Sequence, residues 1–447
     1  MRYAPTALFY AVTLALCAGA PAATTLPDTA GYGPHPTLPE PQKKLVPTMK
    51  IAPAQPWKGD EKPQPAAGLS VNAFARDLAH PRNLLVLPNG DVLVAETDTP
   101  AKPEDNKGIK GKITKHVQYE AGSGHGSANR ITLLRDADGD GSAEKQAVFL
   151  EGLNSPYGMA LVGHTLYVAN TDSLVKVPYQ GGEIKAGAAP QKVADLPGGP
   201  LNHHWTKSLV ASSDGKHLYV GVGSNSNAGE NGIDKEKDRA DILEVDPATG
   251  KWRVYASGLR NPGGLAINPD GGTLWAAVNE RDDLGDDLVP DYMTSVGEGD
   301  FFGFPYSYYG QHVDARVQPQ NAQLVASARS PDYALGAHTA SLGITFAQGD
   351  ALPEPFRGGA FIGQHGSWNR TQPSGYRVVF VKFANGKPTG MPEEVLGGFR
   401  DADGNARGRP VGVAIDKRGA LLVADDVGGR VWRVTAEHGG AATAAAH

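Results

Sequence analysis

One pattern of apolar and polar positions recurs along the chain after Gly68. It consists of an X-Pro or Pro-Gly turn, an apolar run, a turn that contains Gly, and a second run rich in Leu, Val, Tyr or Trp. Short apolar runs between Gly turns, without a helix-like apolar period, predict antiparallel β-hairpins. The clearest copies number six, at residues 88–96, 163–170, 214–222, 269–277, 358–363 and 417–425. Spacings slightly longer than the roughly 40 to 50 residues of a propeller blade predict an all-β, six-bladed β-propeller.

The repeats divide the chain into a predicted signal peptide, a Pro-rich extended arm, a propeller domain and a flexible tail, at residues 1–22, 23–67, 68–436 and 437–447. Met1-Arg2 precedes an apolar stretch from Leu8 to Ala20 and then small residues, which is typical of a signal peptide. We therefore expect a periplasmic or secreted protein. The arm shows no apolar period, so a flexible spacer is its simplest interpretation.

Composition narrows the classes of function. A formal net charge of −6 provides no general attraction to nucleic acid. The single Cys, Cys17, lies in the predicted signal peptide, where it also leaves lipidation open, so the mature chain would have no disulfide and no Cys metal ligand. No later apolar stretch approaches the roughly 20 residues that cross a bilayer, so we expect no transmembrane segment.

Polar residues in two loops are candidates for a site, because the loops of a propeller converge on its axis. His203 and His204 stand before the third hairpin, and a neutral imidazole there can remove a hydroxyl proton. A structural hydrogen bond is the simpler interpretation of an isolated His. Arg260 and Asn261 precede the fourth hairpin, where the guanidinium could hold a carboxylate or form a salt bridge between blades.

Charged residues recur in two further loops. Asp282 and Asp283 belong to an acidic loop that could provide oxygen ligands to a hard cation or could be an ordinary solvated turn. Arg407 and Arg409 alternate before the last hairpin, so in extended chain both would point to one side, toward a polyanionic ligand or toward nearby Asp residues.

The run from Asp136 to Gly141 begins like an EF-hand loop, but Ala147 stands where the bidentate Glu belongs. We interpret it as a hairpin turn that could bind calcium weakly.

Four phrases, in their order along the chain, resemble the PQQ-dependent glucose/sorbosone dehydrogenase family of soluble quinoproteins, and most closely its sorbosone dehydrogenase branch: residues 80–82, 89–97, 154–160 and 223–227. The resemblance covers nearly everything after residue 68. It implies an oxidoreductase that holds pyrroloquinoline quinone (PQQ) and Ca2+ and oxidises an aldose or sugar aldehyde. Its electron acceptor would be a cytochrome or a quinone.

The resemblance also implies roles for individual residues. His204 would be the general base that takes the substrate's hydroxyl proton during hydride transfer to the quinone. The residues implied at the cofactor are Arg260, Asn261, Arg407, Arg409 and Arg370; those implied at calcium, through backbone carbonyls, are Asp282 and Asp283; those implied at the substrate are His203 and His338.

Two departures from the family stand out. Ser224 occupies the place of the acidic residue that orients the catalytic His in glucose dehydrogenases, and their cofactor-contacting Lys has no clear match near residues 366–370, where Arg370 or His365 could substitute. These differences weaken glucose as the substrate.

Two other classes of function remain open. A calcium-dependent lactonase-type propeller hydrolase would need carboxylate and Asn ligands at the channel but no Arg cluster. A non-catalytic ligand-binding propeller would have no reason to gather His, Arg and an acidic loop at one mouth.

Overall fold

The computed structural model describes residues 26–42, 48–100 and 115–437. The predicted signal peptide with Cys17, and the predicted tail beyond residue 437, lie outside these ranges. Among the residues that the structure does describe, no helix is long and apolar enough to span a membrane.

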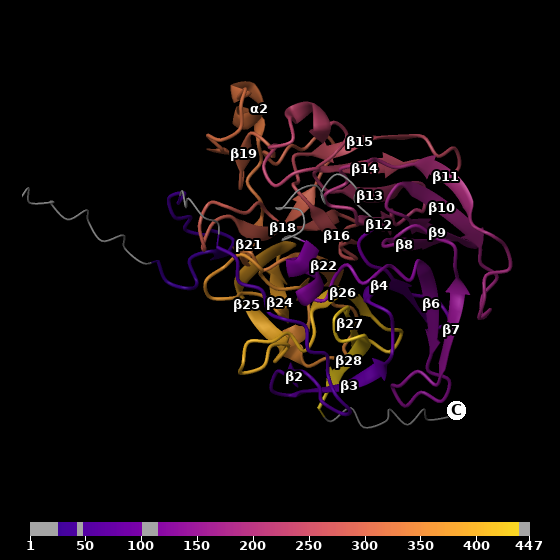
Figure 1. Ribbon diagram of the computed structural model, residues 1–447. Helices are drawn as coiled ribbons and strands as arrows, with labels where there is room; N and C mark the ends of the chain where they lie inside the picture. Colours follow the sequence, from indigo (N-terminus) through magenta and orange to yellow (C-terminus); the bar gives the residue numbers. More distant parts are fainter. Residues whose placement is uncertain (1–25, 43–47, 101–114, 438–447) are drawn as a thin grey trace, which may run out of the picture.

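Six antiparallel sheets are arranged around one axis, which confirms the predicted six-bladed β-propeller (Figure 1). Blades 1 to 3, from the inside outward, are β4 (Pro81–Val86), β5 (Val92–Glu96), β6 (Arg130–Arg135) and β7 (Lys145–Leu150); β8 (Met159–Val162), β9 (Thr165–Ala169), β10 (Ser173–Pro178) and β11 (Gln191–Asp195); and β12 (Lys207–Ala211), β13 (Leu218–Val222), β14 (Asp241–Val245) and β15 (Trp252–Ser257). Blades 4 to 6 are β16 (Pro262–Ile267), β17 (Leu274–Val278), β18 (Pro290–Val296) and β21 (Tyr333–Ala337); β22 (Ser341–Phe346), β23 (Gly359–Gln364), β24 (Arg377–Ala384) and β25 (Lys387–Gly397); and β26 (Pro410–Ile415), β27 (Leu421–Asp425), β28 (Arg430–Ala436) and β3 (Leu69–Ala75).

The second strand of each blade explains why the repeat was visible in the sequence. Strands β5, β17 and β27 are buried at every position, because neighbouring blades cover both faces of each sheet. A strand covered on both faces has a nearly continuous apolar run, without the alternation of a half-exposed strand. The hydrophobic clusters accordingly lie between blades; one of them joins β5 and β6 to β9 and β10.

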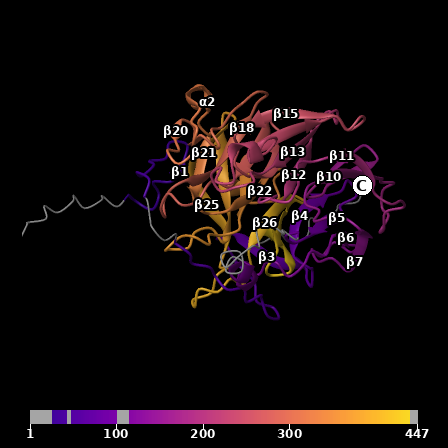
Figure 2. The same ribbon diagram turned by 45° about the horizontal axis from the view of Figure 1, so that its top comes forward.

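The propeller is closed at blade 6. Strand β3, from the N-terminal side of the domain, pairs with β28 near the C-terminal end, with Val71 opposite Val434. The innermost strands β4, β8, β12, β16, β22 and β26 contact one another in a ring, and Figure 2 shows β12, β22 and β26 close to the axis. The inner edges of the blades are short and face the axis, where neighbouring blades protect them.

The arm is not a flexible spacer in this structure. Its strands β1 (Tyr32–Gly33) and β2 (Gln64–Pro65) add a fifth strand to blades 4 and 5, by pairing with β21 and β25. The Trp57 ring packs edge-on against Trp432 at 5.6 Å. Backbone pairing and aromatic burial therefore fix the described part of the arm on the propeller, although no strand-like pattern is visible in its sequence.

Residues 115–120 are helical and lie in the loop of blade 1. Further short elements lie in loops of blades 3 to 5. They comprise a two-stranded hairpin of β19 (Ser307–Tyr308) and β20 (His312–Val313), the short helix α2 (Ala322–Ser327), and the 3-10 turns η1 (Ile233–Glu236) and η2 (Glu354–Phe356).

A candidate site at the mouth of the propeller

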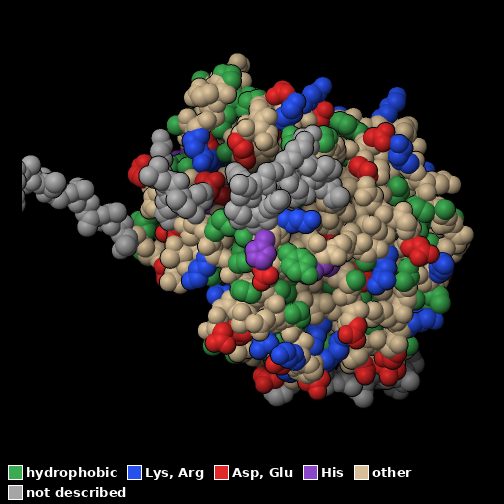
Figure 3. All heavy atoms as spheres, viewed as in Figure 1, with side chains coloured by type: hydrophobic (Ala, Val, Ile, Leu, Met, Phe, Trp, Pro, Cys, Tyr) green, Lys and Arg blue, Asp and Glu red, His purple; other side chains and the backbone are tan. Residues whose placement is uncertain are grey.

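Antiparallel order places two sets of loops at the same end of the propeller. The segments that lead into the innermost strands, and the loops between the second and third strands of each blade, all lie at the end where the innermost strands begin. We call this end the mouth. Figure 3 views it, with basic, acidic and His side chains near the centre. Every residue predicted for the site belongs to one of these loops.

His204 lies in the loop before β12. Its Nδ1 is 2.9 Å from the carbonyl oxygen of Ser224 and 3.0 Å from the Ser224 hydroxyl. Its ring meets that of His203, which is exposed, edge-on at 4.8 Å. A Cβ at position 223 would collide with His204 Cβ and with Asn261 Oδ1, so the close approach of these two side chains requires Gly223. The structure thus places His203, His204 and Asn261 together.

Arg260, in the segment before β16, is buried, with 2% of its side chain exposed. Its guanidinium donates to the carbonyl oxygens of Asn227 at 3.0 Å and of Glu280 at 2.7 Å. It also lies 3.6 Å from the Asp282 carboxylate. Arg260 therefore joins the loops of blades 3 and 4, which is the structural role that the sequence had left open.

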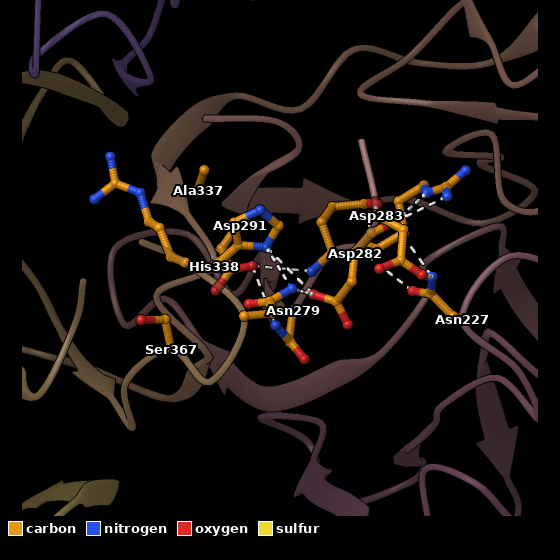
Figure 4. Close-up of polar contacts among 12 residues, drawn as sticks. Asn227, Asn279, Asp282, Asp283, Asp291, Ala337, His338 and Ser367 are labelled. Atoms are coloured by element: carbon orange, nitrogen blue, oxygen red, sulfur yellow. Dashed lines mark hydrogen bonds and ion pairs between the residues drawn. The ribbon is translucent and has the colours of Figure 1, made fainter. Parts of the chain in front are cut away.

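The side chain of Asp282, in the acidic loop, is 15% exposed and is contacted from several sides (Figure 4). Asn369 donates to Asp282 Oδ1 at 2.7 Å, and His338 Nδ1 lies 3.2 Å from the same atom. Burial acts to raise the pKa of Asp282, but the hydrogen bond from His338 and the charge of Arg260 outweigh it, and the net pKa is below its usual value. This carboxylate is surrounded by hydrogen-bond donors.

The predicted calcium ligands do not fit calcium in this arrangement. The Asp282 carbonyl oxygen accepts hydrogen bonds from Arg281 at 2.9 Å and from Asn227 at 3.2 Å. The Asp283 carbonyl oxygen accepts from the Arg316 guanidinium at 3.4 Å, and its carboxylate is 3.2 Å from the same Asn227 amide. Because Ca2+ needs six to eight oxygen ligands, an ion here would have to displace a guanidinium and an amide.

His338 differs from its prediction as a substrate contact. It is buried, and Nε2 lies 2.8 Å from the carbonyl oxygen of Gly285 while Nδ1 faces Asp282. Burial acts to lower its pKa, but the Asp282 carboxylate outweighs it, and the pKa of His338 is raised. With both ring nitrogens engaged, His338 holds the acidic loop in place.

Arg407 and Arg409 have different partners. Arg407 lies in a bend, 3.4 Å from the Asp401 carboxylate and 3.4 Å from that of Glu61 in the arm. Arg409 is buried, donates to the His365 carbonyl at 3.3 Å and lies 4.8 Å from the centre of the Tyr376 ring. Side chains two residues apart point to the same side only in an extended chain, and the chain bends at Arg407.

Arg370 joins blades 4 and 5. It donates to the Asp286 carbonyl at 2.9 Å and to the Asp287 carboxylate at 2.5 Å. It lines a cavity of about 820 Å³ between the arm and these two blades, together with Tyr32 and Arg400.

A buried charged group that the predictions missed lies between blades 5, 6 and 1. Asp426 accepts hydrogen bonds from Arg82 and from His365 Nε2, each at 2.9 Å. Burial, reinforced by the charges of Arg409 and Arg82, lowers the pKa of His365 to about 4. His365, His80 and Arg82 outweigh burial to hold the pKa of Asp426 well below its usual range. The sequence contained one signal for this group. Arg82 precedes the apolar run of the innermost strand of blade 1, as Arg409 precedes that of blade 6.

Several buried polar atoms in the loops of the mouth have no hydrogen-bond partner among the described residues, and Arg82 Nε, Arg409 Nε, Arg239 Nε and Asn369 Oδ1 are among them. Buried N–H groups are ordinarily paired, and leaving one unpaired costs about 1–3 kcal/mol. Unpaired guanidinium N–H groups at one mouth suit a ligand that carries anionic oxygens.

The arm and residues 115–122 of the blade 1 loop contact each other and the rest of the chain at this mouth. Ala54 N donates to the Glu120 carbonyl at 2.8 Å, and His80 Nε2 is 3.1 Å from the Gly122 carbonyl. On the axis, the innermost strands line a cavity of about 400 Å³, with Tyr157 and Leu342 among its walls.

The EF-hand-like run forms the turn between β6 and β7, at the end opposite the mouth. Carboxylate oxygens of Asp136, Asp138, Asp140 and Glu144 lie within 4.8 Å of one another. The Arg418 guanidinium also reaches Asp136, at 3.3 Å. The predicted hairpin turn is confirmed, and it takes no part in the mouth.

Comparison with solved structures supports the fold. The PQQ domain of pyranose dehydrogenase from Coprinopsis cinerea, in its holo form, has a TM-score of 0.68 at 20% identity and covers 86% of this chain and 100% of that one. A calcium structure of the Carbohydrate-Active Enzymes family AA12 protein from Trichoderma reesei has a TM-score of 0.66 at 19% identity, covering 88% and 99%. The PQQ-bound aldose sugar dehydrogenase from Streptomyces coelicolor has a TM-score of 0.52 at 18% identity, covering 83% and 99%.

Sequence comparison supplies the family. Residues 304–437 match a family described as TrAA12-like, and residues 65–367 match a domain of unknown function, DUF7133. An uncharacterized protein of Borreliella burgdorferi is 30% identical over 298 residues, which is 63% of this chain and 76% of that protein. Because the second of these families spans well over half of the sequence, the chain belongs to the DUF7133 family.

Proposed function

We propose that this protein is a PQQ-dependent dehydrogenase that oxidises an aldose or a sugar aldehyde, of the sorbosone dehydrogenase type. The observation that carries the proposal is that two features occur at the same mouth. Ser224 positions the His204 imidazole, and Arg82 and Arg409 each have a buried guanidinium N–H without a hydrogen-bond partner among the described residues. The names of two neighbours in fold, a PQQ domain and a PQQ-bound aldose sugar dehydrogenase, support the cofactor.

The residues that would hold PQQ follow from the unpaired atoms. Arg409 and Arg82 each have a buried Nε–H to offer a carboxylate of the cofactor. Asn261 lies beside His204. Arg260 donates to the Glu280 carbonyl and would in this way hold one wall of the site in place. When bound, the quinone would supply the acceptor of the hydride, which carries two electrons.

His204 acts as the general base of this proposal. Its Nδ1 faces a carbonyl oxygen, so Nδ1 carries the hydrogen and the lone pair of the neutral ring is on Nε2. Nε2 takes the proton from the hydroxyl of the sugar, or of a hydrated aldehyde, as the hydride leaves the same carbon. Lys207, buried and donating to the Trp205 carbonyl at 3.1 Å, fixes the loop that carries this base.

Several parts of the proposal go beyond the site. We expect the mature protein to be exported to the periplasm or secreted, and to pass its electrons to a cytochrome or a quinone. Calcium binding stays a prediction. The oxygens of Asp282 and Asp283 accept hydrogen bonds from protein donors, which a calcium ion at this place would have to displace.

The test is titration of purified mature apoprotein with PQQ, with and without Ca2+, followed by dye reduction with a panel of aldoses and sugar aldehydes. His204→Ala should bind PQQ but lose dye reduction by at least 100-fold, the lower bound of a general base's contribution. His217→Ala is the matched control, because His217 lies at the opposite end of blade 3 and is partly exposed. Absence of quinone binding would refute the proposal, and Ca2+-dependent lactone hydrolysis would favour the hydrolase instead.

A further inference from the structure

Ser224 contacts Nδ1 of His204 with two oxygen atoms. Its carbonyl oxygen is at 2.9 Å and its hydroxyl oxygen at 3.0 Å. A carbonyl oxygen can only accept, so Nδ1 must donate. The hydroxyl hydrogen of Ser224 is directed to the carbonyl oxygen of Ser226, at 2.6 Å, so Oγ also presents a lone pair to Nδ1. Both oxygens therefore require a hydrogen on Nδ1.

Hydrogen bonds with neighbouring groups hold Ser224 in place. It is fully buried, and its N–H donates to the Arg260 carbonyl at 2.8 Å. The Ser226 hydroxyl donates to the Glu236 carboxylate, which also accepts from the backbone of Asn225 at 2.8 Å. This network holds the Ser226 carbonyl where it receives the Ser224 hydroxyl, so the direction of that hydroxyl is set.

The backbone of His204 is held by two contacts, of which one is its N–H donating to the same Ser224 carbonyl oxygen at 3.2 Å. The buried Arg239 guanidinium donates to the His204 carbonyl at 3.0 Å and to Asn202 Oδ1 at 2.9 Å. Burial lowers the pKa of Arg239 to about 10, so it remains charged at neutral pH. Arg239 also donates to the Ser224 carbonyl oxygen at 3.4 Å, so this one oxygen joins the loop to the ring.

We propose that Ser224 is the positioning residue of His204: its two oxygens select the Nδ1–H tautomer and so present the Nε2 lone pair to the substrate. The identity of the reaction rests on the proposed function, but the tautomer is a property of the protein alone. A carboxylate at this position would favour the imidazolium, whereas two neutral oxygens favour it less. Ser224 thus orients the base while leaving it neutral to lower pH than a carboxylate would.

The test begins without substrate or cofactor. Long-range 1H–15N NMR spectra of 15N-histidine-labelled apoprotein report the tautomer, and His204 is assigned by the signals that disappear in His204→Gln. The neutral ring should carry its hydrogen on Nδ1. Ser224→Ala keeps the carbonyl oxygen and should keep the tautomer.

Ser224→Asp should raise the titration midpoint of the His204 ring by about 1–3 pH units, the range for an adjacent opposite charge. The acid limb of the pH profile for dye reduction should move by the same amount. Ser142→Asp, at an exposed turn at the far end of blade 1, is the control and should move neither.

An Nε2–H tautomer in the wild-type protein would overturn the proposal, and so would an unmoved midpoint in Ser224→Asp. If PQQ fails to bind and no dye is reduced, the proposed function fails while the NMR result still decides the role of Ser224. If Ser224→Asp does not fold, the wild-type tautomer decides alone.

Discussion

Asp426 is the carboxylate that balances the buried charge at the mouth, and its replacement by Asn gives a quantitative test. The side chain is 1% exposed and receives Arg82 Nη1 and His365 Nε2, each at 2.9 Å. Asn has nearly the same size, but it is neutral and has one acceptor atom in place of two. Both donors reach Oδ2, whereas Val427 N–H donates to Oδ1. Asp426→Asn would therefore turn its amide N–H either toward Val427 N–H or toward Arg82 and His365, and it would leave the Arg82 charge buried without a carboxylate.

The expected cost follows from burial. Removing one partner of a buried ion pair typically destabilises a protein by about 3–5 kcal/mol, because the remaining charge is left uncompensated. Asp195→Asn is the matched control, since it makes the same chemical change in an exposed ion pair with Lys192, where the side chains are 83% and 60% exposed. An exposed pair contributes about 0–1 kcal/mol.

Urea unfolding at pH 7, followed by tryptophan fluorescence, provides the assay. We expect the unfolding midpoint of Asp426→Asn to fall well below that of the wild type at an unchanged slope, and the midpoint of Asp195→Asn to stay close to it. A destabilisation of Asp426→Asn below about 1 kcal/mol, or equal to that of the control, would refute the view that Arg82 depends on this carboxylate for its burial.

Three further predictions concern other residues of the mouth and the arm. The pKa of His365, lowered to about 4, lies below the 6.5 of the unfolded chain, so stability that is present above pH 6.5 should be lost as the pH falls from 6.5 to 4, by about 3 kcal/mol in urea unfolding; His365→Gln should remove this dependence. Trp57→Phe removes an indole N–H that donates to the buried carboxylate of Asp425 at 2.8 Å, and should lower the unfolding free energy by about 1.5–3 kcal/mol. Gly223→Ala would displace His204, and should reduce dye reduction by at least about tenfold in a protein with wild-type circular dichroism.

Each of these changes has a control elsewhere in the chain. His164→Gln, at an exposed turn, should leave the pH dependence unchanged. Trp368→Phe alters a Trp that is 44% exposed, and should cost less than Trp57→Phe. Gly187→Ala adds a Cβ in open space and should keep full activity. A variant that behaves like its control would contradict the contact on which its prediction rests.

The blades could be predicted because the second strand of each blade has an apolar pattern that can be recognised without knowledge of its neighbours in space. Residues 92–96 and 421–425 are buried at every position, so their apolar runs and the Gly turns before them are visible without knowledge of neighbours. The arm could not be predicted in the same way. Its strands contain two residues each and are defined by the edges of blades 4 and 5, which are more than 300 residues away in the chain.

The candidate site shows a similar division. The sequence located the loops of His204, Arg260 and Arg409, because each loop precedes an apolar run of the repeat. It did not determine where the side chains point, since the partners of Arg260 are carbonyl oxygens at residues 227 and 280.

Six hairpins, an all-β class and the loops that contain candidate chemistry can thus be predicted from local sequence pattern. The contact of Ser224 with Nδ1 of His204, and the neutralisation of Arg82 by Asp426 across 344 residues of chain, can be seen only in the folded protein. The physical reason is that strand propensity and turn chemistry act between near neighbours, whereas hydrogen bonds and buried charges depend on which groups closure of the propeller brings together.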